Sequence, residues 1–119
     1  MHHESDDFIG NILGKLLNRQ LENQSMRRKV GRWRMSVVLD TDYYPISILF
    51  SDQIEIVADC VDNPTIVLSM KFSTIIGLFR GGTSMIGALL RGKIKTRGLL
   101  SHPLSMLRFY RLMASILGG

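Results

Sequence analysis

The hydrophobic pattern of this chain changes its period near residue 70, and that change constrains the fold more than any other feature. Before it, four segments alternate apolar and polar side chains with a period of two, at residues 33–40, 46–51, 53–58 and 65–70. This alternation predicts strands with one buried face. Short turn-forming stretches, such as residues 40–45 and 62–64, separate them. Consecutive strands joined in this way predict a largely antiparallel sheet.

Helical spacing of apolar side chains marks four further segments, at residues 8–24, 72–80, 83–90 and 103–117. Either Thr83 or Ser84 is placed to cap the third of them, and Pro103 lies in the first turn of the fourth. Residues 92–98 predict a fifth strand, and the basic residues 26–34 predict a linker that leads into the first strand. The sequence therefore predicts an α+β fold in which helices cover one face of a five-stranded, largely antiparallel sheet.

The chain length suits one domain overall, since 119 residues leave little room for a second core. Within it we expect an amphipathic N-terminal helix over residues 1–25 and the remaining elements over residues 26–119. The polar, acidic start does not look like a secretory signal. Cys60 is the only cysteine, so no intramolecular disulfide is possible. We expect a cytoplasmic protein, with Cys60 as a small buried side chain at a strand end.

Charge is distributed in blocks along the chain, which has a net charge of +5. Residues 36–70 contain acids and no Lys or Arg, whereas residues 71–119 contain Lys and Arg and no acid. One explanation is that acidic strands pair with basic ones and neutralise them. The other is a basic face that attracts anionic head groups, either of a membrane surface or of a ligand. Nucleic acid is not expected as a partner, because no aromatic side chains are interleaved with the basic ones near Lys93 and no nucleic-acid-binding motif occurs.

The sequence carries no recognisable catalytic machinery. His102 is the only histidine outside the first three residues, and its place beside Pro103 favours a surface or capping role. No spacing of His and Cys suits a metal ion. The run of residues 81–84 resembles a phosphate-binding loop but lacks the Gly-Lys-Ser/Thr ending. We therefore expect a protein that is not an enzyme and that has no metal and no cofactor.

Residues 81–98 resemble a motif of the sterol carrier protein type-two family. Gly81 ends a short helix, Ala88 follows seven residues later, Gly92-Lys93 comes next, and Gly98 closes a short strand. The order of predicted elements fits the same family from about residue 26 to residue 117. Two positions depart from the pattern, since Arg91 stands where the family has a small residue and Leu99 where it often has Asp.

This resemblance implies a hydrophobic cavity between the sheet and the helices, which would hold a lipid. The candidate cavity residues share an apolar helical face and are Phe72, Ile75, Ile76, Phe79, Met85, Ile86, Leu89, Met106, Phe109, Tyr110 and Met113. Candidate contacts to an acidic head group are Arg80, Arg91 and Lys93. The same apolar stripes would also suit an ordinary filled core, so an apolar cavity of a few hundred Å³ is the feature that would distinguish a carrier.

Two functions follow from these observations. The first is non-catalytic binding and transfer or presentation of a hydrophobic ligand, which is sterol-like, fatty acyl or isoprenoid. The second is a ligand-free interaction or dimerisation module, such as an accessory subunit of a lipid- or quinone-modifying enzyme. The corresponding partners are a lipid or fatty acyl ligand, a membrane surface touched peripherally, and a second copy or a partner enzyme. The N-terminal amphipathic helix could bind such a surface or partner with its apolar face.

Overall fold

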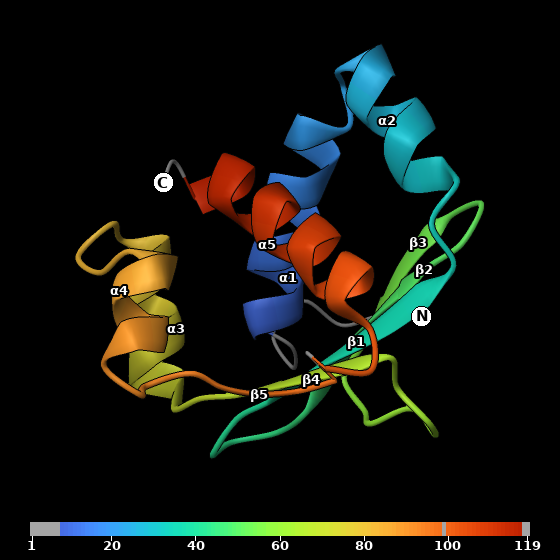
Figure 1. Cartoon of the computed structure of the whole chain (residues 1–119). Helices are drawn as coiled ribbons and strands as arrows, with labels where there is room; N and C mark the ends of the chain where they lie inside the picture. The colour runs from blue at the N-terminus through green and yellow to red at the C-terminus, as the bar shows by residue number, and fades with distance from the viewer. Residues whose placement is uncertain (1–7, 99, 118–119) are drawn as a thin grey trace.

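The computed structural model describes residues 8–98 and 100–117, which form five helices and five strands (Figure 1). The first half contains α1 (Phe8–Gln20), α2 (Gln24–Gly31), β1 (Met35–Asp40), β2 (Ile46–Phe50) and β3 (Ile54–Val57). The second half contains β4 (Ile66–Ser69), α3 (Phe72–Phe79), α4 (Met85–Leu90), β5 (Lys95–Arg97) and α5 (Pro103–Leu117). The predicted α+β class and five-stranded sheet are confirmed.

The five strands form a single sheet in the order β3-β2-β1-β4-β5. All neighbouring pairs are antiparallel except β1 and β4, which run parallel. The parallel pair arises because the connection from β3 to β4 crosses the sheet instead of turning back at its edge. The sheet is therefore mixed but largely antiparallel, as the alternating segments predict.

The connection between β3 and β4 lies on the face of the sheet that the helices leave free. Ser47, a fully buried residue of β2, donates a hydrogen bond to the carbonyl of Asp59 and accepts one from the amide of Val61 at 3.1 Å. Val38 lies opposite Ser47 in the register and is also buried. This crossing segment thus covers one face, and the helices cover the other.

The hydrophobic core lies between the sheet and α1 and α5, which are in contact with each other (Figure 1). Ile9, Leu13 and Leu17 give α1 a fully buried stripe, and Phe109 and Leu112 do the same for α5. Phe109 meets Phe50 edge to face with ring centroids 6.2 Å apart. The apolar face of the N-terminal helix is therefore part of this core, and the expectation that this face binds a membrane or a partner is wrong.

The predicted linker at residues 26–34 is wrong over most of its length, because residues 24–31 form α2. The helix begins where Asn23 accepts a hydrogen bond from the amide of Met26 at 3.1 Å. Only Val30 on this helix is buried. The apolar periodicity that reveals a helix in a sequence is consequently absent here, and the predicted first helix, residues 8–24, ends earlier, at Gln20.

Three smaller expectations also need correction. Acidic and basic strands do not pair: β3 and β5 lie at opposite edges of the sheet, and Lys95 and Arg97 face Ser69 and Val67. Cys60 is exposed and not buried, since it follows the last residues of β3 on the crossing segment. The fifth strand is shorter than predicted because regular pairing is confined to Lys95–Arg97.

Candidate functional site

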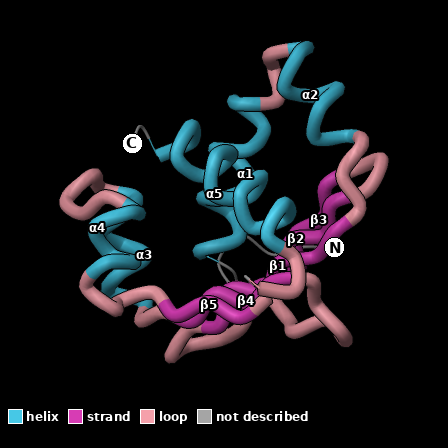
Figure 2. The backbone as a smooth tube through the Cα atoms, viewed as in Figure 1, coloured by secondary structure: helices cyan, strands magenta, loops and turns pink. Residues whose placement is uncertain are grey.

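Helices α3 and α4 form a pair that stands to one side of α1 and α5 (Figure 2). The start of α3 is held by the turn between β1 and β2, because the Asp42 carboxylate accepts a hydrogen bond of 2.7 Å from the amide of Phe72. The Tyr43 ring stacks on the Phe72 ring at 4.6 Å. Of the two predicted capping residues it is Ser84 that caps α4, by accepting a hydrogen bond from the amide of Gly87. The pair is thus fixed to the sheet near the start of α3.

An apolar cavity lies where this pair meets the sheet, α1 and α5. Every side chain that lines it is apolar: Leu13, Leu39, Leu68, Met70, Ile75, Leu78, Phe79, Met85, Ile94, Phe109, Met113 and Leu117. Its free volume is only about 30 Å³, roughly the volume of one water molecule. Small-molecule pockets usually measure about 300–1,000 Å³. The site is therefore a narrow apolar seam between packed elements in this conformation, smaller than the cavity that a carrier is expected to have.

The predicted cavity residues divide into three groups. Five line the seam, namely Ile75, Phe79, Met85, Phe109 and Met113. Met106 is buried in the core, Leu89 and Tyr110 are half-buried beside it, and Ile76 is half-buried on α3. Phe72 packs on Tyr43 at the start of α3, and Ile86 is 47% exposed on α4. The structure thus brings together about half of the predicted set.

A lysine-lined depression of about 600 Å³ lies next to the seam at the start of α3. Three lysines line it, Lys71 before α3 and Lys93 and Lys95 after α4, together with the hydroxyl-bearing Ser73 and Thr74. Met70 lies in the wall of both the seam and this depression. An amphipathic molecule whose tail entered the seam past Met70 would consequently leave its head group among the three lysines.

The three predicted head-group residues are not all at this depression. Lys93 lines it, whereas Arg80 and Arg91 are exposed residues that cap the C-terminal ends of α3 and α4. Lys71 and Lys95 were not singled out from the sequence. Lys95 is close to Lys93 in the chain, whereas Lys71 is brought near both by the pairing of β4 with β5, which aligns Ser69 with Lys95.

Sequence reasoning also missed the seam residues that come from the sheet and from α1. Leu39 and Leu68 are neighbours in the β1–β4 register, and Leu13 reaches the seam from α1. Their alternation or helical spacing marks them as buried. Local sequence patterns do not indicate which helix lies over which strand. That Leu13, Leu39 and Leu68 line the seam was therefore not predictable from spacing alone.

Among residues 8–98 and 100–117, no three His, Cys, Asp or Glu side chains are grouped closely enough to hold a metal ion. The helices of this described part are all too short or too polar to cross a bilayer. The positions of the apolar seam and of the basic surfaces are therefore the features from which a function has to be argued.

No protein-family model and no curated protein matches this sequence. Several solved structures match its fold. One is described as the UbiJ-SCP2 ubiquinone synthesis protein, with a TM-score of 0.64, 12% identity and 91% of each chain covered. Another is sterol carrier protein domain 2 of Helicoverpa armigera, with a TM-score of 0.62, 16% identity, and 85% of this chain and 84% of that chain covered.

A third match is the apo form of sterol carrier protein 2 from Yarrowia lipolytica, with a TM-score of 0.59, 12% identity and 96% of each chain covered. The resemblance that residues 81–98 carry is therefore confirmed at the level of the fold. At these low identities the likeness establishes the fold alone, and function has to be argued from the site.

Proposed function

We propose that this chain, which has the fold of sterol carrier protein 2, binds one amphipathic lipid and carries or presents it without catalysis. The lipid tail, whether sterol-like, fatty acyl or isoprenoid, would lie in the apolar seam under α3 and α4. The single observation that supports this most strongly is that Met70 lines both the seam and the lysine-lined depression. The exposed thiol of Cys60 suits a reducing compartment such as the cytoplasm.

Entry of a tail into the seam requires α3 and α4 to move away from α5, because the free volume is small. The turn between the two helices contains Gly81 and Gly82, and both are exposed. Asp42 and Tyr43 hold only the start of α3. We therefore expect the pair to open about its attachment near Phe72, with its far end moving most.

The apolar lining supplies the free energy for this opening. Each buried CH₂ group contributes about 0.8 kcal/mol, so a 16-carbon tail contributes roughly 12 kcal/mol before the costs of association and of opening. Met70, Met85 and Met113 line the seam, and methionine repacks readily around guests of varied shape. The lining thus favours an oily guest without selecting one head group.

The lysines would select an anionic head group. Lys71, Lys93 and Lys95 are exposed, and no ion pair occupies them among the described residues. Each would contribute modestly, since exposed charge pairs are worth about 0.2–1 kcal/mol. Arg80 and Arg91 lie farther away and would act only by attracting an anion toward this end of the molecule.

Palmitic acid and its alcohol analogue, hexadecanol, test this proposal as a matched pair. Replacing all three lysines by glutamine is expected to weaken binding of the acid about tenfold, because three charge contacts are lost. Binding of the alcohol is expected to stay within about twofold, because its tail contacts are unchanged. Displacement of a fluorescent fatty acid measures both affinities.

A control variant carries the same loss of charge elsewhere, with Lys15, Arg19 and Arg97 replaced by glutamine. These residues are exposed and line neither the seam nor the depression. An equal loss of palmitic acid affinity in the two variants would show that the three lysines act only through general electrostatic attraction. Failure of the unaltered protein to bind either compound would refute lipid binding itself.

The second candidate function is a ligand-free module that serves a lipid- or quinone-modifying enzyme. The narrowness of the seam favours it, and one structure of similar fold is described as a ubiquinone synthesis protein. Under this alternative the seam stays closed and the outer surfaces bind a partner. Absence of binding in the palmitic acid experiment would leave this function as the remaining candidate.

A further inference from the structure

A second basic surface lies on the opposite side of α5 from the seam. It is a cleft of about 930 Å³ whose walls are α2 and α5. Five cationic side chains line it, Arg28, Lys29 and Arg32 from α2 and its end, and Arg108 and Arg111 from α5. No acidic side chain lines this cleft. Five like charges gathered in one cleft create a strong local attraction for anions.

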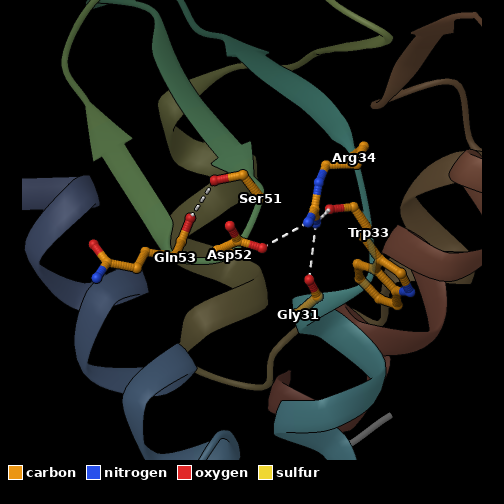
Figure 3. A network of polar contacts seen from close by, with 6 residues as sticks. All are labelled: Gly31, Trp33, Arg34, Ser51, Asp52 and Gln53. Carbon is orange, nitrogen blue, oxygen red and sulfur yellow. Dashed lines mark hydrogen bonds and ion pairs between the residues drawn. The ribbon is translucent and has the colours of Figure 1, made fainter.

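These five cations lack internal counter-charges within residues 8–98 and 100–117, where the one ion pair joins Arg34 to Asp52. The Arg34 side chain lies just after the end of α2, beside the turn between β2 and β3 (Figure 3). The Arg34 guanidinium donates hydrogen bonds of 2.8 Å to the carbonyls of Gly31 and Trp33, and one of 2.6 Å to the Asp52 carboxylate. These contacts link the end of α2, which forms one wall of the cleft, to the turn between β2 and β3.

Exposed leucines continue the cleft along α5. Leu104 and Leu107 are 65% and 44% exposed, and they precede Arg108 and Arg111 on the same side of the helix, because positions three, four and seven residues apart share a face. Leu100, just before this helix, is 95% exposed. Exposed apolar side chains beside a cluster of cations match the interface of a bilayer, where leucines enter the acyl boundary and cations meet phosphates.

We propose that this surface, formed by the cleft between α2 and α5 and by Leu100, Leu104 and Leu107, docks the protein on an anionic membrane. Charge complementarity assigns the occupant, since five unopposed cations and a row of exposed leucines fit anionic phospholipid head groups above an oily layer. The docking does not depend on the seam. The face of α5 that carries Phe109 and Met113 toward the seam is the one turned away from the bilayer.

Cosedimentation with vesicles tests this docking. The unaltered chain is expected to bind vesicles of phosphatidylcholine with 30 mol% phosphatidylglycerol, and to bind pure phosphatidylcholine vesicles far more weakly. Replacing Arg28, Lys29 and Arg32 by glutamine is expected to weaken binding to the anionic vesicles roughly 100-fold, because each cation near such a surface contributes about fivefold. Binding is also expected to fall as salt rises.

Two further variants keep the test specific. The Lys15, Arg19 and Arg97 glutamine variant has the same net charge and should lose much less affinity. Leu104→Ser with Leu107→Ser should weaken binding to anionic vesicles at low salt. Trp33, the only tryptophan, lies in the cleft and 5.4 Å from the Phe50 ring centroid, so its emission reports both vesicle binding and an intact fold.

Equal losses in the two charge variants would overturn the proposal, because the cleft would then be no different from the rest of the basic surface. Absence of vesicle binding at low salt would also overturn the proposal. The same holds if an acidic peptide binds the cleft and anionic vesicles do not. Palmitic acid binding is measured on the same variants. Its persistence in the cleft variant, with vesicle binding lost, separates membrane docking from ligand binding.

Discussion

Replacing Phe109 by alanine is expected to lower the free energy of unfolding by about 3–5 kcal/mol, the usual cost of removing a buried phenylalanine side chain. Phe109 is 1% exposed and lies between the Phe50 ring and the apolar seam. Its removal takes away the contact between the Phe109 and Phe50 rings and leaves a cavity between α5 and the sheet. Urea unfolding followed by far-UV circular dichroism measures the change.

Leu107→Ala provides the matched control on the same helix. Leu107 is 44% exposed, so its truncation is expected to change the free energy of unfolding by less than about 0.5 kcal/mol. A loss below about 1 kcal/mol for Phe109→Ala would mean that the interior collapses around the missing ring. The description of Phe109 as a close-packed part of the core between α5 and the sheet would then be incorrect.

Gly98→Ala is expected to destabilise the protein by about 2–4 kcal/mol, through backbone strain and a collision. Gly98 closes β5 with a φ of +100°, which side-chain-bearing residues rarely adopt. An added Cβ would lie 2.5 Å from the carbonyl oxygen of Thr65, and a backbone atom in a paired region cannot move aside cheaply. Thermal unfolding of the purified variant checks this prediction.

Gly92→Ala separates the two causes. Gly92 has a φ of +74° but nothing within 4 Å of an added Cβ, so only the conformational cost of about 1–2 kcal/mol applies. Equal losses of stability in Gly92→Ala and Gly98→Ala would show that the close approach to Thr65 adds nothing to the destabilisation. The difference between the two variants explains in physical terms why the motif that resembles the sterol carrier family ends in glycine at this position.

The sequence predicted those elements whose buried side chains recur with the period of a strand or a helix. The strands around Val37, Ile48 and Leu68 and the helix around Phe109 alternate or repeat strongly, and each formed close to its expected bounds. Helix α2 was missed because Val30 is its only buried side chain. Its place depends on the Asn23 cap and on the hydrogen bonds of Arg34, which leave no hydrophobic period.

The candidate site was only half predictable for a related reason. Ile75, Phe79 and Met85 belong to apolar helical faces, so their burial could be expected. Which of these faces meets the sheet, and how closely, depends on tertiary packing. The width of the seam and the gathering of Lys71 with Lys95 therefore became visible only in the folded chain.

Native mass spectrometry of the gently purified protein, before and after incubation with palmitic acid, tests the central claim most directly. The claim is that the seam beneath α3 and α4 opens to hold one lipid. It predicts a single added mass in the lipid range per chain, removed by solvent extraction and restored by the added acid. A chain that stays at its own mass in all three conditions would contradict it.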